Sequence, residues 1–251
     1  MSLSAVLITK NEGHNLADCL ETLKFCTEII VVDSGSTDDT VEVARRFTSK
    51  VFQKSWTNFA EQRNYAASLA TQPWIFSIDA DERVSSALAA ELQSLVANPQ
   101  GHTAFAVPRK TFHFGRWIAH GGWYPNYVTR LFQRDAGRWD GGELHEFWTT
   151  AGRQGQLTNA LDHYSFRDLA DQVARNNRYS SLGAVVLRKQ GQSFSFLRLA
   201  GKTVSKFFET YFLKKGFLDG LPGFIIAVSA AYSVFLKWAK LWEMERTASH
   251  E

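Results

Sequence analysis

Two aspartates, Asp79 and Asp81, stand one residue apart where the apolar run 74–78 ends. In an extended chain successive side chains alternate between faces, so these two carboxylates point the same way and can share one hard cation. Mg²⁺ or Mn²⁺ takes such oxygen ligands and typically keeps only one or two protein carboxylates, while phosphates and water complete its shell. The pair therefore predicts a divalent-cation site that also receives phosphate oxygens.

Other chemistry is compatible with the same two aspartates. In haloacid-dehalogenase-type phosphotransferases the first Asp of such a pair is a nucleophile, but the pair normally follows the first strand of the domain. Here it follows the fourth predicted strand and precedes Glu82 and Arg83, which argues against a nucleophile. A strand end followed by a solvated acidic turn is the structural alternative. His163 is a candidate to complete the metal shell, because imidazole and carboxylate together suit Mn²⁺-like ions.

Strand and helix alternate four times in the first hundred residues. Short apolar runs predict strands at 3–9, 29–32, 51–53 and 74–78, and amphipathic segments predict helices at 15–25, 40–47, 59–69 and 85–96, with Asn15 as the first N-cap. This order predicts a three-layer α/β domain with a mostly parallel sheet. Ligands of such sheets bind outside the carboxyl ends of the strands, which is where Lys10–Glu12, Asp33 and Asp79 fall.

The phosphate-binding glycine motifs are absent. No G-x-G-x-x-G follows the first strand, and no G-x-x-x-x-G-K-[ST] occurs. A nucleotide bound here would therefore have its phosphates neutralised by a metal rather than by a glycine loop. Arg130 could pair with a diphosphate through its planar guanidinium, and a surface salt bridge is the alternative interpretation.

From residue 101 the pattern changes. A strand is predicted at 104–107, followed by a stretch dense in aromatic residues and glycine at 111–127. Aromatic rings beside polar groups suit sugar rings, and a hydrophobic lid over the sheet edge is the alternative. A further strand is predicted at 156–161, directly before His163.

The net charge of +3 hides a strong asymmetry. Residues 172–242 carry eleven lysines and arginines against two acids, a net charge of +9, so the remainder carries −6. After a predicted helix at 168–189, the uncharged run 221–236 is short for spanning a bilayer. Flanking lysine and interfacial tryptophan predict a helix lying on an anionic membrane surface; these residues are Lys237, Trp238, Lys240 and Trp242. A dimer interface or a C-terminal core helix is the alternative, and no nucleic-acid recognition motif appears.

Two features bear on the compartment. Cys19 and Cys26 lie seven residues apart in one predicted helix and imply no disulfide framework. The N-terminus enters a strand directly, without a basic region or cleavage site, so we expect no secretory signal. Together with the basic segment, these features predict a cytoplasmic protein that is peripherally associated with the inner face of the cytoplasmic membrane.

Seven short stretches carry, in order, a resemblance to a known family: 6–12, 31–38, 63–64, 78–82, 129–132, 144–146 and 162–166. They resemble the family 2 inverting glycosyltransferases. More narrowly, they are similar to the lipopolysaccharide-core branch, whose β-1,4-glucosyltransferases act on inner-core heptose. The resemblance covers most of the chain.

The resemblance implies a GT-A type fold that binds a nucleotide-diphosphate sugar, usually a uridine one. By this resemblance Thr9 and Glu12 would contact the nucleoside and ribose, and Asp33 would accept from the base. Arg63 would lie over the base or phosphate, with Asp79 near the ribose and Asp81 on the metal. The expected nucleotide-sugar residues are then Thr9, Asn11, Glu12, Asp33, Arg63, Asp79 and Arg130, and the expected metal residues are Asp81, Asp79 and His163.

Glycosyl transfer needs a general base because a sugar hydroxyl is a weak nucleophile. Three candidates cluster in segment 141–146: Glu143, His145 and Glu146. The resemblance places Glu146 at the base position of the family, with His145 as its orienter. The expected cofactor, Mg²⁺ or Mn²⁺, would stabilise the charge that grows on the leaving diphosphate.

The expected activity is that of a metal-dependent inverting hexosyltransferase. It would move a hexose, with glucose as the first candidate, from a UDP-sugar to a lipid-linked saccharide such as inner-core heptose. The rival functions are transfer to polyprenyl phosphate and a non-catalytic nucleotide-sugar-binding membrane scaffold. The expected domains are a GT-A catalytic domain at 1–166, with a nucleotide-sugar half at 1–100 and an acceptor half at 101–166, and a helical membrane-associating extension at 167–251.

Overall fold

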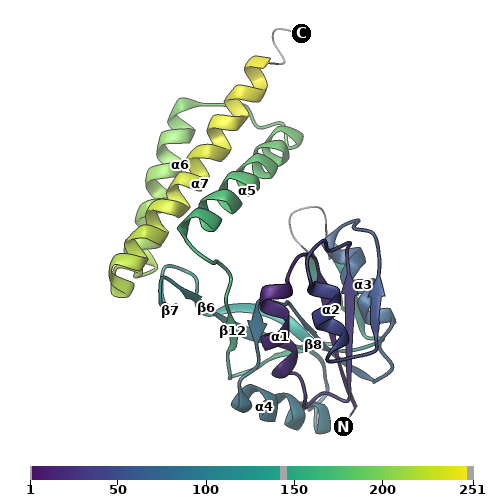
Figure 1. Ribbon diagram of the computed structural model, residues 1–251. Helices are drawn as coiled ribbons and strands as arrows, with labels where there is room; N and C mark the ends of the chain where they lie inside the picture. Colours follow the sequence, from purple (N-terminus) through teal and green to yellow (C-terminus); the bar gives the residue numbers. More distant parts are fainter. Residues whose placement is uncertain (1, 142–145, 248–251) are drawn as a thin grey trace. The chain divides into compact units, whose positions relative to one another are not determined.

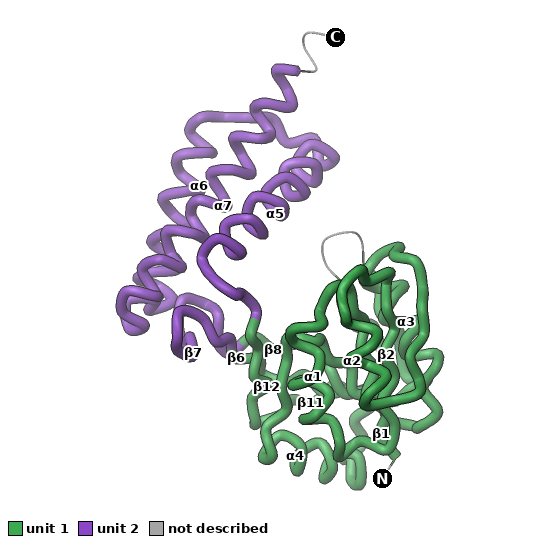
Figure 2. The backbone as a smooth tube through the Cα atoms, viewed as in Figure 1, with its two compact units in different colours: residues 1–110, 126–164 green, residues 111–125, 165–251 purple. Residues whose placement is uncertain are grey.

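The computed structural model describes residues 2–141 and 146–247 (Figure 1). The chain divides into two compact units (Figure 2): unit 1 contains residues 1–110 and 126–164, and unit 2 contains residues 111–125 and 165–251. Residues 111–125, part of the predicted acceptor half, thus group with the helical unit. The predicted domain boundary between residues 166 and 167 stays a prediction.

Unit 1 contains a sheet whose N-terminal part is parallel. β1 (Leu3–Thr9) pairs in parallel with both β2 (Glu28–Asp33) and β4 (Trp74–Ile78), and β3 (Val51–Gln53) pairs in parallel with β2. Alternate residues of β1 and β2 contribute to two separate hydrophobic clusters, one on each face of the sheet. Their uninterrupted apolar sequences reflect this double burial.

Antiparallel strands extend the sheet in the order β3-β2-β1-β4-β8-β6-β12-β5. The added strands are β8 (Asn126–Gln133), β6 (His102–His113), β12 (Leu161–His163) and β5 (Glu82–Arg83), with β11 (Arg153–Gln156) alongside β6. Two further strands, β9 (Gly137–Gly141) and β10 (Glu146–Thr150), form a separate antiparallel pair.

Helices and the β9–β10 pair cover the two faces of the sheet. One hydrophobic cluster combines the strands with side chains of α1 (Gly13–Glu21), α2 (Thr40–Arg45) and α4 (Ser86–Ala97). The other combines them with α3 (Phe59–Ser68) and with Trp139 of β9. Unit 1 therefore has the predicted three-layer α/β architecture.

The bounds of one predicted helix and the continuity of one predicted strand in unit 1 differ from the structure. The first helix begins at Gly13 rather than Asn15, because the backbone N–H groups of Asn15 and Leu16 already donate to Glu12 O, and Cys26 lies beyond its end. The predicted strand 156–161 is interrupted. Backbone N–H groups of Thr158 and Asn159 donate to the Glu91 carboxylate at 2.7 and 2.8 Å, which bends the chain between β11 and β12.

Unit 2 is mainly helical. α5 (Leu169–Lys189), α6 (Phe196–Phe208) and α7 (Gly220–Thr247) run side by side (Figure 1), and the π-helical turn η1 (Glu209–Leu213) and the 3-10 turn η2 (Gly216–Asp219) connect α6 to α7. β7 (Arg116–Ile118) pairs with the end of β6 to form a hairpin. Buried Asp219 accepts the backbone N–H groups of Ala119 and His120, which fixes this hairpin to η2.

The C-terminal helix is longer than the uncharged run predicts. Residues Gly216–Thr247 are long and apolar enough, by length and composition alone, to cross a membrane. Pro222 lies in the first turn of α7, where a backbone N–H is not needed, and the helix continues through the lysines after residue 236. Two of the side chains predicted to face a membrane surface, Lys240 and Trp238, lie instead against the rest of unit 2. Lys240 donates to Asn177, Ser180 and Ser181 of α5, and Trp238 is buried.

Candidate functional site

The carboxyl ends of β1, β2 and β4 meet at one edge of the sheet. The parallel register pairs Thr9 with Asp33 and Leu7 with Ile78, so Asp79 follows β4 beside the end of β1. Thr9 Oγ1 lies 3.4 Å from Asp33 Oδ1. The structure therefore brings together the strand-end residues that the sequence predicts.

Asp33 is fully buried and its carboxylate is occupied by its own loop. One oxygen accepts the backbone N–H groups of Gly35 and Ser36 at 2.9 Å each, and the other accepts the Ser36 hydroxyl at 2.5 Å. Gly35 has a φ of +83°, which favours glycine. The first role of Asp33 is thus to shape the loop after β2.

The loop after β1 is tied to the loop after β2. Asn11 N donates to Ser36 Oγ and Asn11 Oδ1 accepts the N–H of Thr37, both at 2.8 Å, while Glu12 N donates to Thr40 Oγ1 at 2.8 Å. Asn11 has a φ of 56°, in the left-handed region that Asn tolerates better than most residues. These bonds hold Asn11 and Glu12 in fixed positions at the edge.

Asp79 is held between two arginines. Arg63 Nη2 donates to Asp79 Oδ1 at 2.7 Å, and Arg130 Nη2 donates to Asp79 Oδ2. Burial by itself would raise the pKa of Asp79, but Arg130 and Arg63 together hold this pKa far below its usual range. Both oxygens of Asp79 therefore carry a guanidinium partner, and Asp79 is ionised.

Glu82, which we did not predict as a site residue, lies at the centre of this network. It is fully buried, and its Oε1 accepts Arg130 at 2.6 Å and Arg109 at 3.3 Å. Its Oε2 accepts the backbone N–H of Asp79 at 2.9 Å. The sequence signal was its position three residues after Asp79, the spacing at which a carboxylate can reach back to a backbone donor.

Glu146 completes the charge balance. Its Oε1 lies 3.4 Å from Arg63 Nε, an ion pair rather than a hydrogen bond, since this nitrogen has no hydrogen-bond partner among the described residues. Three arginines, Arg63, Arg109 and Arg130, thus face three carboxylates, Asp79, Glu82 and Glu146; we call these six residues the charge network. Two other base candidates, Glu143 and His145, lie outside the described residues.

Asp81 has a different environment from Asp79. Its Oδ2 lies 3.3 Å from His163 Nε2, and its backbone carbonyl accepts the N–H of Tyr164 at 2.8 Å. The pairing of β12 with β5 sets His163 opposite Glu82, which explains how residues 82 positions apart meet. A carboxylate and an imidazole in contact form a donor set that suits Mg²⁺- or Mn²⁺-like ions.

Within the described residues, no cluster of three or more His, Cys, Asp or Glu side chains is placed to hold a metal. Among the described residues, Asp81 and His163 lie together as possible ligands, whereas the third predicted ligand, Asp79, is paired with two arginines; phosphate oxygens and water would complete the shell, as is usual for Mg²⁺. This donor set fits a cation that binds together with a nucleotide diphosphate better than a permanently bound structural metal.

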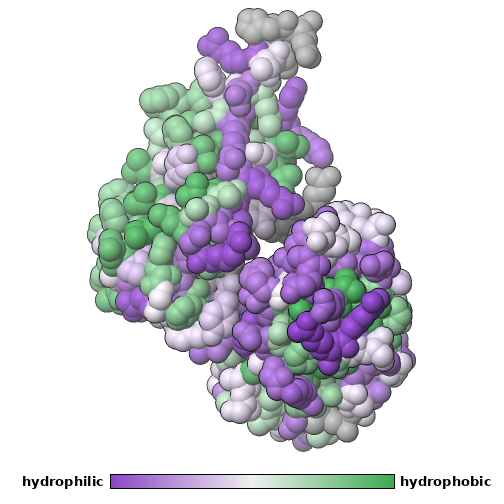
Figure 3. Space-filling model, viewed as in Figure 1, coloured by the Kyte–Doolittle hydropathy of each residue, from purple (hydrophilic) through white to green (hydrophobic). Residues whose placement is uncertain are grey.

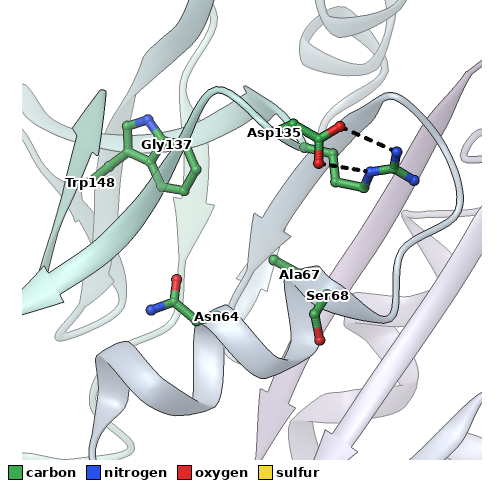
Figure 4. A pocket seen from close by; sticks show the side chains of 7 residues that line it. Asn64, Ala67, Ser68, Asp135, Gly137 and Trp148 are labelled. Atoms are coloured by element: carbon green, nitrogen blue, oxygen red, sulfur yellow. Dashed lines mark hydrogen bonds and ion pairs between the residues drawn. The ribbon is translucent and has the colours of Figure 1, made fainter. Parts of the chain in front are cut away.

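A cavity of about 350 Å³ is lined by residues of α3, of the turn before β9, and of β9 and β10 (Figure 4). It is lined by Asn64, Ala67, Ser68, Arg134, Asp135, Gly137 and Trp148, none of which is a predicted site residue. Asn64 accepts from Trp139 N and donates to Trp139 O, both at 2.8 Å, and so fastens α3 to β9. The cavity belongs to the support of the β9–β10 pair rather than to the strand-end edge.

Comparison with known sequences identifies relatives over nearly the whole chain. Residues 4–152 match the sequence model of the family described as Glycosyl transferase family 2. The lipopolysaccharide core biosynthesis glycosyltransferase LpsC of Rhizobium meliloti is 32% identical over 97% of this chain and 93% of its own length. An uncharacterized glycosyltransferase of Rickettsia felis is 33% identical over 96% of this chain and 89% of its own length.

Solved structures share the fold at low sequence identity. Residues 1–349 of S. aureus TarS match with a TM-score of 0.50 and 15% identity, covering 99% of this chain and 92% of that one. Glucosyl-3-phosphoglycerate synthase from Mycobacterium tuberculosis, solved with Mn²⁺, UDP and phosphoglyceric acid, matches with a TM-score of 0.50 and 16% identity, covering 77% and 80%. The predicted GT-A type fold class is confirmed.

Proposed function

This chain belongs to glycosyl transferase family 2, and from that membership we propose a metal-dependent, inverting transfer of a hexose from a UDP-sugar to a lipid-linked saccharide. The similarity to LpsC, named for lipopolysaccharide core biosynthesis, supports an acceptor in that core; within it, inner-core heptose is the acceptor and glucose the hexose that we propose to test first. TarS has been solved with UDP-GlcNAc, and the synthase with Mn²⁺ and UDP, which supports a uridine donor and a divalent cation.

One observation carries the proposal: Asp79 and Glu146 contact the same guanidinium, that of Arg63, at 2.7 and 3.4 Å. The Glu146 carboxylate thus lies one side chain away from the Asp79–Asp81 turn. A general base must lie close to both the acceptor hydroxyl and the activated sugar. Its contact with Arg63 supports the assignment of that role to Glu146.

The proposed chemistry is a single displacement. Glu146 takes the proton of the acceptor hydroxyl, whose oxygen forms the new bond to the anomeric carbon while the bond from that carbon to the diphosphate breaks. Attack opposite the leaving group inverts the configuration. Asp81 and His163 would hold the cation, which when bound stabilises charge on the leaving diphosphate.

The remaining predicted residues position the donor. In the proposal, the loops that carry Thr9, Asn11, Glu12 and Asp33 receive the nucleoside and ribose, and Arg63 lies at the border between donor and base. Arg130 is almost fully buried under Asp79, so we assign it to holding Asp79 rather than to direct contact with the diphosphate. His145 remains the proposed orienter of Glu146.

Donor and acceptor can be identified with two measurements. A panel of nucleotide sugars, each scored with Mn²⁺ by protection against thermal unfolding, identifies the donor because a bound ligand raises apparent stability. Release of the nucleotide diphosphate, with and without a lipid-core acceptor, then separates an enzyme from a non-catalytic scaffold. If no nucleotide diphosphate is released with any lipid-core or polyprenyl phosphate acceptor, the transferase proposal is overturned.

Transfer to polyprenyl phosphate is the second candidate. A phosphate acceptor is already ionised and needs little help from a base. Unchanged turnover after Glu146→Gln, with polyprenyl phosphate as the acceptor, would favour this candidate over the saccharide acceptor.

We also propose that the basic C-terminal segment associates the enzyme peripherally with the inner face of the cytoplasmic membrane, where lipid-linked saccharides are built. The support is the net charge of +9 over residues 172–242, because anionic lipids attract lysine and arginine near the surface.

A further inference from the structure

The sequence leaves three arrangements open for the apolar run 221–236: lying in the plane of a membrane, re-entering the membrane, or packing on the protein. In the structure, α7 has two distinct long faces. One packs against α5, where Ala184 of α5 forms a small core with Trp238 and Leu241 of α7. Along this face α7 packs on the protein, as a member of a helical unit rather than as an isolated segment.

Polar groups fasten this packed face. Asn176 of α5 donates to Ser229 Oγ of α7 at 2.7 Å, and Lys240 of α7 donates to Asn177 Oδ1 at 2.6 Å and to Ser180 Oγ at 2.9 Å. A membrane-spanning α7 would carry these groups, and α5 with them, into hydrocarbon. α5 exposes Arg178, Arg188 and Lys189, and charged side chains are strongly disfavoured there. The structure therefore argues against a span.

The opposite face of α7 is apolar and exposed. Leu221 is 69% exposed, and Phe224, Val228, Tyr232 and Phe235 are 39–45% exposed. Their spacing of three or four residues places them in one stripe along the helix. Polar side chains would cover such a stripe in a helix that faces only water.

α6 carries a matching stripe. None of its thirteen residues is buried. Leu197, Val204 and Phe208 are 81%, 55% and 52% exposed, and Phe212 of η1 continues the line at 49%. Gly201 falls between Leu197 and Val204, and its surroundings are open. Because glycine has no side chain, no polar group interrupts the stripe there.

Aromatic rings join the two stripes. Phe208 contacts Phe207 and Phe212 with ring centroids 5.9 and 5.3 Å apart, and Phe207 and Tyr211 reach Phe224 of α7 at 6.0 and 5.7 Å. The exposed residues of η1 and η2 extend the same surface. We call it the apolar platform: Leu197, Val204, Phe208, Phe212, Leu213, Phe217, Leu218, Leu221, Phe224, Val228, Tyr232 and Phe235. Figure 3 shows hydrophobic residues gathered over the α6 side of unit 2.

Positive charge borders the platform. Arg198 and Lys202 are exposed and follow Leu197 and Gly201 by one residue each, so they form a basic stripe about 100° around α6. Of the two acids between residues 196 and 235, Glu209 pairs with Lys206 and Lys214, and Asp219 is buried. The charge presented to a partner is therefore positive.

We infer that unit 2 docks flat on an anionic lipid surface through the apolar platform, with α6 and α7 in the membrane plane. Exposed aromatic and aliphatic side chains beside a basic stripe match the acyl boundary and the anionic headgroups of a bilayer. A second copy of the chain fits less well, because a self-paired platform brings the same basic stripes into one interface.

Docking in this way has a consequence for the acceptor, a point that rests on the proposed function. Gly121 N donates to Lys214 O at 2.8 Å, and Asp219 holds the backbone at Ala119 and His120. The aromatic hairpin formed by β6 and β7 is thereby fixed to the η1–η2 end of the platform. A lipid-linked saccharide would meet this hairpin at the membrane surface.

The test uses the full chain and flotation with vesicles of phosphatidylcholine alone or mixed with phosphatidylglycerol. Leu197→Ser, Leu213→Ser and Leu221→Ser, combined, remove three highly exposed side chains and should leave the fold intact. Their partitioning to mixed vesicles should fall at least about tenfold. The matched control, Tyr179→Ser with Val185→Ser, changes exposed apolar residues of α5 and should alter partitioning by less than about twofold.

Charge is tested separately. Arg198→Glu with Lys202→Glu should remove the preference for phosphatidylglycerol, whereas Arg188→Glu with Lys189→Glu on α5 should retain most of it. An alkaline carbonate wash should release the wild-type protein from membranes. Retention after the wash would overturn the in-plane arrangement.

Sedimentation velocity tests the alternative that a second copy of the chain, rather than a membrane, covers the apolar platform. If the triple serine variant loses self-association but floats with mixed vesicles as well as wild type, the platform is a dimer interface and the inference is wrong. Turnover on a soluble, delipidated acceptor should be the same in wild type and the triple variant. If neither turns over while lipid binding behaves as expected, the transferase proposal fails and the docking inference stands.

Discussion

Units 1 and 2 use arginine and aromatic side chains in opposite ways. In unit 1 the guanidiniums of Arg63 and Arg130 are buried and paired, and the aromatic rings of Phe76 and Phe132 fill the core. In unit 2 many aromatic rings lie at the surface and Arg198 is exposed beside them. Buried, paired charges hold their side chains in one arrangement, whereas a large exposed apolar surface is typical of a site that binds another molecule. This difference agrees with the proposal that unit 1 positions the ligands and unit 2 attaches the protein to a surface.

The largest effect is expected when a buried charge is removed from unit 1. Arg130→Met leaves Asp79 and Glu82 without their shared partner and should lower the free energy of unfolding by about 3–5 kcal/mol, measured by urea denaturation. The control Arg134→Met removes an exposed ion pair with Asp135 and should cost less than about 1 kcal/mol. Equal effects would show that the charge network does not act as a buried unit.

Removing the proposed base tests whether the charge network serves catalysis. Glu146→Gln keeps the side-chain volume but cannot take a proton, so turnover should fall at least about a hundredfold while nucleotide-sugar binding persists. The change is scored by nucleotide-diphosphate release and by binding titration. Glu42→Gln, an exposed glutamate on α2, should be neutral. Near-normal turnover with the saccharide acceptor would remove Glu146 from the role.

A buried carboxylate of unit 1, Glu28, should make the stability of the fold depend on pH in the acid range. Burial would raise the pKa of Glu28, but hydrogen bonds from Lys50, Ser4 and Thr71 outweigh it and lower this pKa to about 2. The resulting stabilisation is present above the unfolded-state pKa of about 4.3 and is lost as pH falls toward 2, an effect of roughly 3 kcal/mol.

Glu28→Gln should therefore flatten the acid limb of the stability profile between pH 4.5 and 2, roughly the window set by the two pKa values. The free energy of unfolding by urea across that range measures it. Glu61→Gln, an exposed residue of α3, serves as the control. An unchanged acid limb would mean that Glu28 is not the group that titrates.

The metal assignment is tested at Asp81. Asp81→Asn keeps the contact geometry with His163 but removes a charge, so Mn²⁺-dependent binding of UDP should weaken by about tenfold or more. Isothermal titration with and without EDTA measures the change, and Asp18→Asn on the exposed face of α1 is the control. If EDTA leaves wild-type binding unaltered, Asp81 holds no metal.

The smallest expected effect lies in unit 2. Burial lowers the pKa of His113, partly offset by Gln172 and Asp171, so the folded state favours the neutral ring. The unfolded state then binds more protons, and the stabilisation present above about pH 6.5 is lost as pH falls. His113→Asn should reduce this pH dependence.

Hydrogen exchange of the β6–β7 hairpin between pH 7.5 and 5 would report the loss, a range chosen to bracket the unfolded-state pKa of about 6.5. The exposed His14→Asn, in unit 1, should behave as wild type. Similar slopes for wild type and His113→Asn would exclude His113 as the titrating group.

Much of unit 1 could be predicted because its signals are local. β1, β3 and β4 match the predicted bounds, since strands buried on both faces read as continuous apolar runs. The strand-end placement of Asp33 and Asp79 followed from the parallel order. The predicted strand 156–161 failed because a distant side chain sets the backbone conformation there: the carboxylate of Glu91 accepts the N–H groups of Thr158 and Asn159.

The site itself was only partly predictable. Asp79 and Asp81 form one motif in the sequence, yet their partners differ: two arginines for Asp79 and His163 for Asp81. The central position of Glu82 depends on Arg109 and Arg130, 27 and 48 residues away. Roles that depend on such long-range partners carry no periodic pattern in the sequence.

The sequence alone determined the α/β order, the cluster of acids at the strand ends, the family and the basic, aromatic character of the C-terminal segment. Only the tertiary structure decided which carboxylate is neutralised by arginine, that Lys240 faces α5, and which face of α7 is left apolar and exposed. The physical reason is that burial and pairing are set by residues 16 to 100 positions apart, as in the contacts of Asp79 with Arg63, of Lys240 with Asn177 and of Asp219 with Ala119.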